Sequence, residues 1–164
     1  MQGDVTSIES SAFSYCTNLE SITIPSSVET IDDFAFRECL NIKTIKIPSK
    51  VTIIEDYLFY SCINLESIEI DGNLVSIKQK AFEGCTNLSL FYFDGTTDPT
   101  FVDNSFLNTQ ISNVYVSSSY GYETFCGFPV IAEHFYQCGP SLEYTIRENK
   151  ACNQRRRPNE QFFL

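Results

Sequence analysis

Apolar residues recur along this chain in columns with a period of 23 positions. In each unit one stretch alternates polar with β-branched apolar residues, and it occupies residues 21–24, 44–47 and 67–70. Alternation with a period of two is typical of a strand with one buried face. The columns that we predict to be buried contain Phe13, Phe36, Phe59 and Phe82; Ile22, Ile45, Ile68, Phe91 and Val114; Ile24, Ile47, Ile70, Phe93 and Val116; and Ile8, Ile31, Ile54 and Ile77.

Proline marks the end of the predicted strand in two units. Pro25 and Pro48 directly follow the alternating stretch, and because proline lacks an N–H, pairing ends there and the chain must turn. A second short extended piece then recurs at residues 28–31, 51–54 and 74–77. We expect it to line the opposite wall of each coil.

The rest of each unit forms an arc that brings the chain back to the next strand. In the arc at residues 33–39, Phe36 and Cys39 lie three positions apart, so one helical or 3₁₀ turn would point both inward. A 23-residue unit cannot bury its own apolar face, whereas stacked units share a continuous core. We therefore predict an α/β repeat solenoid of four to five coils, mostly strand and irregular structure, with a parallel sheet and short helical or 3₁₀ arcs.

The repeated unit has the form Ala-Phe-x-x-Cys-x-Asn-Leu-x-x-Ile-x-Ile-Pro-x-x-Val-x-x-Ile, as at residues 12–31. This pattern resembles the BspA-like class of leucine-rich repeats, found in surface antigens of microbes and parasitic protists. The resemblance covers about residues 4–117. It implies a right-handed coil, a protein-binding or adhesion role, and a location at the cell surface or outside the cell.

The repeat pattern divides the chain into three parts. We assign residues 1–117 to the solenoid, although the pattern frays after Phe93: Phe106 comes one position late and Asn108 stands at the cysteine position. A fifth strand is expected at residues 112–116. Residues 118–136 are expected to form a cap coil, and residues 137–164 to be poorly ordered or loosely packed.

Charge limits the classes of partner. The formal net charge is -10, which argues against nucleic acid and anionic lipid because both would be repelled at long range. The basic run Arg155–Arg157 is interpreted as a solvated tail. The sequence shows neither a secretion signal nor a stretch apolar enough to span a bilayer, so without the family resemblance a cytoplasmic location would be expected.

Two polar columns are predicted to be structural. The cysteines lack the paired short spacing of a zinc site, and in a ladder their side chains point the wrong way for disulfides. We therefore expect free, buried thiols, while one pair among Cys126, Cys138 and Cys152 could bridge. The asparagines are expected to bond backbone groups that the turn leaves unpaired, although Asn87 also begins a glycosylation sequon. The two columns contain Cys16, Cys39, Cys62 and Cys85, and Asn18, Asn41, Asn64 and Asn87.

Candidate catalytic groups are sparse. The single histidine, His134, lies outside the repeats and has no nucleophile motif near it. The acidic pairs 32–33 and 55–56 could share a calcium ion, but Lys78 and Lys80 in the next unit favour a solvated acidic face. There is no Gly-rich phosphate loop. We expect no enzymatic activity, no cofactor and no metal.

Binding is predicted on the outer face of the parallel sheet, where the side chains vary from unit to unit. With the isoleucines turned inward, the positions between them face solvent, and exposed aromatic side chains there favour an interface with a protein or cell-surface macromolecule. A competing interpretation is that the cap or tail covers these aromatics. The candidate ligand-binding residues are Thr23, Lys43, Lys46, Glu66, Glu69, Leu90, Tyr92 and Tyr115.

An alternative function is purely architectural. The chain would then be one segment of a longer repeat protein, with no binding site of its own. This alternative expects Ile8 and Phe13 to be exposed at the first rung, where no preceding unit covers them.

Overall fold

The computed structural model describes residues 4–133, which form eleven short strands and no helix, so none of the described residues lies in a helix able to cross a membrane. The strands are β1 (Ser7–Ile8), β2 (Thr30–Ile31), β3 (Thr44–Ile47), β4 (Ile53–Ile54), β5 (Ser67–Ile70), β6 (Ser76–Ile77), β7 (Leu90–Phe93), β8 (Thr100–Phe101), β9 (Val114–Ser117), β10 (Thr124–Phe125) and β11 (Phe128–Glu133).

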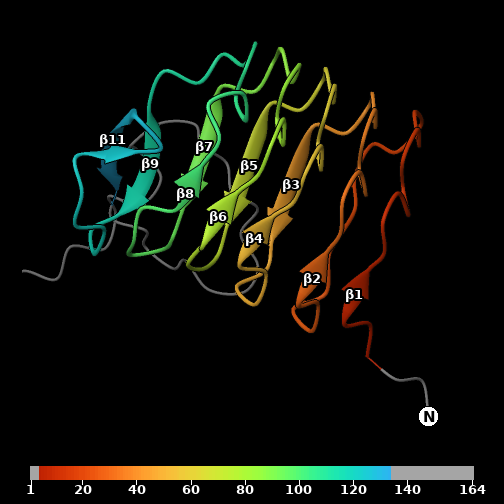
Figure 1. Ribbon diagram of the computed structural model, residues 1–164, viewed down its shortest axis with the longest axis horizontal. Helices are drawn as coiled ribbons and strands as arrows, with labels where there is room; N and C mark the ends of the chain where they lie inside the picture. Colours follow the sequence, from red (N-terminus) through yellow and green to blue (C-terminus); the bar gives the residue numbers. More distant parts are fainter. Residues whose placement is uncertain (1–3, 134–164) are drawn as a thin grey trace, which may run out of the picture. The chain divides into compact units, whose positions relative to one another are not determined.

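These strands stack as the rungs of a solenoid, which confirms the predicted fold (Figure 1). One wall is a six-stranded sheet in the order β10-β11-β9-β7-β5-β3, and the opposite wall contains β4, β6 and β8. Strands β3, β5, β7, β9 and β11 are parallel to their neighbours, whereas β10 pairs antiparallel with β11. Turns follow Pro25 and Pro48, where Val28 N and Val51 N each donate to the proline carbonyl at 3.0 Å.

The strand expected at residues 21–24 is absent, so that part of the prediction is wrong. These residues have no strand assignment, and no backbone hydrogen bond between described residues joins them to β3. An outermost strand has a neighbour on one side only and lacks the second ladder that holds the inner strands. The first two rungs are joined instead through β1 and β2, where Ile8 pairs with Ile31.

The arcs are turns rather than helices, which corrects the expected helical or 3₁₀ conformation. Each arc has left-handed residues at fixed positions, for example φ 59° at Phe34 and φ 55° at Glu38, and left-handed backbone interrupts a right-handed helix. Cys39 N still donates to Phe36 O at 3.2 Å, closing one isolated turn. Both Phe36 and Cys39 are fully buried, as predicted.

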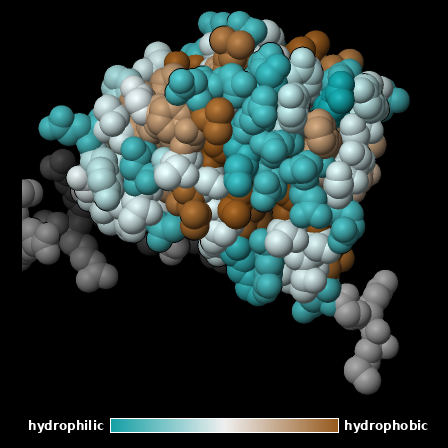
Figure 2. All heavy atoms as spheres, viewed as in Figure 1, coloured by the Kyte–Doolittle hydropathy of each residue, from teal (hydrophilic) through white to brown (hydrophobic). Residues whose placement is uncertain are grey.

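The core is a series of side-chain columns that run from rung to rung. The phenylalanine rings stack face to face, with centroids 5.2 Å apart for Phe13–Phe36, 5.6 Å for Phe36–Phe59 and 5.4 Å for Phe59–Phe82. Ile8 is only 8% exposed and Phe13 is half-buried, so both side chains of the first rung are more buried than expected. On the face drawn in Figure 2, hydrophobic residues form small patches separated by hydrophilic ones.

The cysteine column is free and lies in the same core. Cys39, Cys62 and Cys85 are buried, and each thiol donates a hydrogen bond to a phenylalanine carbonyl of the preceding rung at 3.0–3.1 Å. Burial, with the neighbouring groups of Cys62 and Cys16, raises the pKa of Cys39 to about 12. Cys16 is exposed, contrary to the prediction, because no described rung precedes its own.

The irregular rung contains one extra residue between β7 and β8. Partners in β6 and β8, such as Ser76 and Thr100, are 24 positions apart, whereas partners in β5 and β7 are 23 apart. Phe106 therefore stacks on Phe82 at 5.3 Å although it comes one position late. Thr109 occupies the cysteine position, since Thr109 N donates to Phe106 O as Cys85 N donates to Phe82 O. Asn108 instead takes the left-handed position before it, with φ 64°.

The last described coil is short. The chain passes from β9 through β10 into β11, which pairs with β9 so that Val130 lies beside Val114. Cys126 is buried and free, so it forms no disulfide. The expectations for His134, Cys138, Cys152, the arginine run and residues 137–164 lie outside the described residues.

We predict that Phe59→Ala lowers the free energy of unfolding by about 3 to 5 kcal/mol, because it leaves a cavity between two stacked rings. Ile63→Ala, at a side chain that is 41% exposed, is the control and should change it by no more than about 0.5 kcal/mol. Urea unfolding followed by circular dichroism measures both. Equal losses would contradict a core built on the phenylalanine column.

We also predict that maleimide labels Cys16 in the native protein well before Cys39, Cys62 or Cys85. All three inner thiols are buried and therefore shielded from the reagent. The thiolate is the reactive form; burial raises the pKa of Cys39, and a hydrogen bond with Cys85 together with burial raises the pKa of Cys62. Mass spectrometry of labelled peptides, with and without urea, measures the order. Early labelling of Cys62 would show that the rungs separate readily.

Candidate functional site

The outer face of the six-stranded sheet carries one straight column of side chains. The strand register places Lys46, Glu69, Tyr92, Tyr115 and Ile131 side by side on β3, β5, β7, β9 and β11. Sequence analysis included the first four and missed Ile131, because the short last coil breaks the 23-residue period. Residues 128–132 form a short continuous apolar run, which was the available signal for a strand there.

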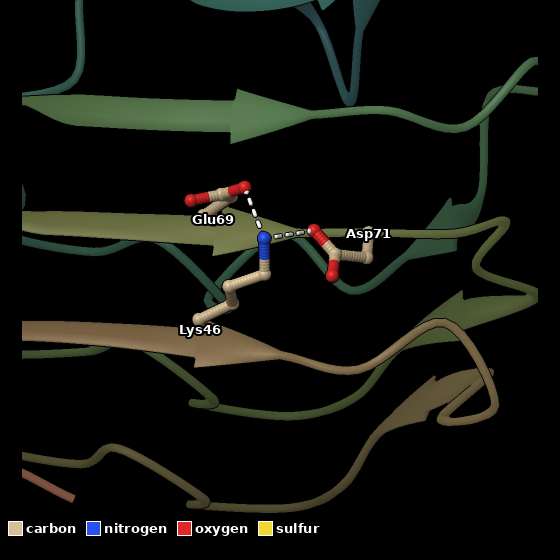
Figure 3. Close-up of polar contacts among 3 residues, drawn as sticks. All are labelled: Lys46, Glu69 and Asp71. Carbon is tan, nitrogen blue, oxygen red and sulfur yellow. Dashed lines mark hydrogen bonds and ion pairs between the residues drawn. The ribbon is translucent and has the colours of Figure 1, made fainter. Parts of the chain in front are cut away.

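One end of this column is charged. The Lys46 ammonium group lies between two carboxylates, 2.6 Å from Glu69 Oε1 and 2.8 Å from Asp71 Oδ1 (Figure 3). Partial burial works against the charged lysine, but the hydrogen bonds to Asp71 and Glu69 outweigh it and raise the pKa of Lys46. Asp71 directly follows β5 and was not among the sequence-based candidates. The cluster therefore presents one net negative charge.

The other end of the column is aromatic and apolar. The rings of Tyr92 and Tyr115 stack with centroids 5.1 Å apart and an angle of 24° between their planes. Tyr92 is only 9% exposed, whereas Leu90 and Tyr115 are half-buried and Ile131 is 41% exposed. Tyr115 and Ile131 therefore offer the accessible surface, and Tyr92 supports Tyr115 from beside it.

The remaining candidates lie around this column. Lys43 and Glu66 are exposed and immediately precede β3 and β5, and Glu66 N donates to Lys43 O at 2.8 Å. Thr23 is exposed, but it does not belong to the sheet because its rung forms no strand there. The sheet therefore brings together the predicted residues of the middle and C-terminal rungs and leaves Thr23 apart.

The asparagine column makes contacts between rungs. Asn64 donates to the backbone carbonyl of Leu40 at 2.8 Å, as predicted. Asn87 instead donates to the side-chain oxygen of Asn64, at 3.4 Å. Asn87 is exposed, so its sequon lies on the surface.

The acidic pairs at residues 32–33 and 55–56 are half-buried, in the short connections that lead from β2 and β4 into the arcs. Asp56 Oδ1 accepts a hydrogen bond from Gln79 N at 2.8 Å. Burial raises the pKa of the Glu55 carboxyl; Lys78 offsets part of this rise, and neighbouring aspartates add to it. Among residues 4–133, no group of three or more Asp, Glu, His or Cys side chains is arranged to hold a metal ion.

Comparison with known proteins identifies the repeat. Residues 6–128 match the family model described as the BspA type leucine-rich repeat region, in six copies. No curated protein and no solved structure matches the chain. The match spans most of the chain and includes strands β3, β5, β7 and β9 of the sheet face, whereas β11 extends beyond it.

We predict that Glu55→Gln stabilises the protein at pH 7 and that this gain disappears as pH falls toward 4. Folding raises the pKa of the Glu55 carboxyl, so ionisation is less favourable in the native state than in the unfolded chain. The native state therefore loses stability as pH rises above the pKa that Glu55 has in the unfolded chain. Melting temperatures across this pH range measure the effect, with the exposed Glu20→Gln as control. A gain that persisted at pH 4 would point to packing rather than charge.

Proposed function

Because the chain belongs to the BspA-type leucine-rich repeat family, we propose that it is a non-catalytic protein-binding or adhesion module whose ligand lies on the outer face of the six-stranded sheet. The supporting observation is the side-chain column on that face. Inward columns repeat nearly unchanged from rung to rung, whereas this column changes from charged to aromatic to aliphatic. A surface of this kind can specify one partner without disturbing the stack.

The two ends of the column suit different parts of a ligand. Tyr115 and Ile131 can bury apolar surface, and exposed aromatic side chains are favoured anchors in interfaces. The Lys46, Glu69 and Asp71 cluster is already satisfied internally at 2.6 and 2.8 Å. Its main contribution would therefore be orientation and selectivity, because opening these pairs for an ill-matched partner costs free energy.

The proposed partner is a protein or another cell-surface macromolecule, encountered at the cell surface or outside the cell as the family resemblance implies. A net charge of -10 disfavours nucleic acid. Leucine-rich repeats of this type generally mediate interactions and are generally non-enzymatic. We accordingly assign no catalytic residue, cofactor or metal to the chain.

We predict that Tyr115→Ala weakens binding to cultured epithelial cells at least about 30-fold, the loss expected for an interface anchor worth about 2 kcal/mol. Flow cytometry with the fluorescently labelled chain measures binding, and melting temperatures verify folding. Val75→Ala, at a side chain that is 63% exposed outside this sheet, is the matched control and should bind like the unmodified chain.

Unchanged binding by Tyr115→Ala, together with a loss in Val75→Ala, would move the site to another face. Absence of saturable binding by the unmodified chain would favour the architectural alternative, a segment that only supports other repeats.

A further inference from the structure

The arcs carry a backbone hydrogen-bond ladder that runs in one direction only. We call the segments 11–16, 34–39, 57–62, 80–85 and 104–109 the arcs; in Figure 1 they follow one another along the upper edge. The central file of the ladder joins each arc to the next through Phe13 N to Ala35 O (2.8 Å), Phe36 N to Leu58 O (3.0 Å), Phe59 N to Ala81 O (2.8 Å) and Phe82 N to Ser105 O (2.8 Å).

Two further files flank the central one and point the same way. One file contains Tyr15 N to Arg37 O and Glu38 N to Tyr60 O, both at 2.8 Å. The other contains Ser11 N to Asp33 O at 3.0 Å and Phe34 N to Asp56 O at 3.1 Å. The N–H groups between the files are used inside the turn, as in Ser14 N to Ser11 O at 3.0 Å. Every such bond between described arcs has its donor in the earlier rung and its acceptor in the later one.

A one-way ladder has chemically different ends. At the first rung, the carbonyls of Ala12 and Ser14 in the arc and of Ser10 just before it would be the starting acceptors of the ladder, and no described backbone group donates to them. In the last arc, the N–H groups of Asn104, Phe106 and Asn108 would be its final donors, and none of them donates to a described backbone carbonyl. The last coil supplies no further arc because β9 leads through β10 directly into β11.

Both ends also expose apolar surface. The arc of the first rung is called the head, and on this rung Tyr15 in the arc and Val5 before β1 are each 55% exposed. At the last arc, which we call the tail, Leu107 is 51% exposed. A groove of about 370 Å³ beside the tail is lined in part by Phe101, Leu107 and Phe128. Each end therefore combines unpaired backbone groups of a single kind with side chains that gain from burial.

We propose that this chain associates with copies of itself head to tail, the carbonyls of one head arc accepting hydrogen bonds from the N–H groups of another copy's tail arc. Two heads would bring acceptors against acceptors, and two tails donors against donors. Head-to-tail docking continues the ladder across the interface, and aligned peptide dipoles favour the same polarity. Such a heterologous contact forms rings or open chains of copies rather than a closed symmetric dimer.

The net charge decides how this association responds to salt. Each copy carries a formal charge of -10, so copies repel one another at low ionic strength, and salt screens that repulsion. Association should therefore strengthen as salt is added. This inference does not depend on the sheet-face ligand, since the arcs and the six-stranded sheet are different parts of each rung.

The test blocks the two ends separately in the full 164-residue chain. Tyr15→Glu blocks the head and Leu107→Glu blocks the tail, because each places a charge at the contact. Val75→Glu is the matched control, since it adds the same charge at an exposed aliphatic position away from the arcs. Ala12→Glu, in the head arc itself, is a second head variant if Tyr15→Glu does not fold, and circular dichroism verifies the fold of each protein.

Sedimentation equilibrium over a concentration series in high salt gives the average mass. The unmodified chain and Val75→Glu are expected to rise beyond twice the mass of one chain, while each blocked variant alone stays at the mass of one chain. An equimolar mixture of head-blocked and tail-blocked variants should approach twice that mass and stop, because each copy retains one complementary end. A monomeric unmodified chain would overturn the proposal, and so would dimers formed by either blocked variant alone.

Discussion

The structure depends on one constraint, that each rung can bury its apolar side chains only against the equivalent side chains of its neighbours. Phe36 is covered by Phe13 on one side and by Phe59 on the other, with centroids 5.2 and 5.6 Å away. Burial therefore requires strict register between rungs rather than any fixed composition within one rung. The extra residue before β8 is tolerated because it lies in a connection, and Phe106 returns to the column on the surface of Phe82.

The same constraint accounts for bulky residues in left-handed backbone. Phe34, Tyr57 and Lys80 have φ of 59°, 56° and 54°, a conformation that costs about 1 to 2 kcal/mol for residues other than glycine. Each of them occupies the first position of an arc, where a left-handed residue accompanies the bond to the next rung. The rings of Phe34 and Tyr57 stack at 4.9 Å, and the Lys80 ammonium lies 5.8 Å from the Tyr57 ring centroid. Contacts between rungs thus offset strain within each rung.

Sequence periodicity predicted the features that depend on the register between rungs, and it failed for those that depend on local backbone geometry. The phenylalanine and isoleucine columns, β3 and β5 follow from side-chain spacing alone, because stacking forces equivalent residues together. The arc conformation could not be inferred in this way, since Phe36 and Cys39 point inward both in a helical turn and in the turn observed. Thr23 was misplaced because periodicity treats the first rung like the inner ones. Asp71 and Ile131 were missed because they lie beyond the repeated strand pattern.

Register also determines where function can vary. A change at Phe59 alters the packing of two neighbouring rungs, whereas a change at Tyr115 alters the sheet face and its contact with Tyr92. Recognition can therefore differ along the outer column while the stack is preserved. The arcs add a polarity that side-chain columns lack, because a stack of rings is the same from either end but a ladder of N–H to carbonyl bonds is not. If copies associate head to tail through this ladder, their sheet faces all point the same way along the assembly. Several weak contacts with a surface then combine into stronger attachment than one chain could make.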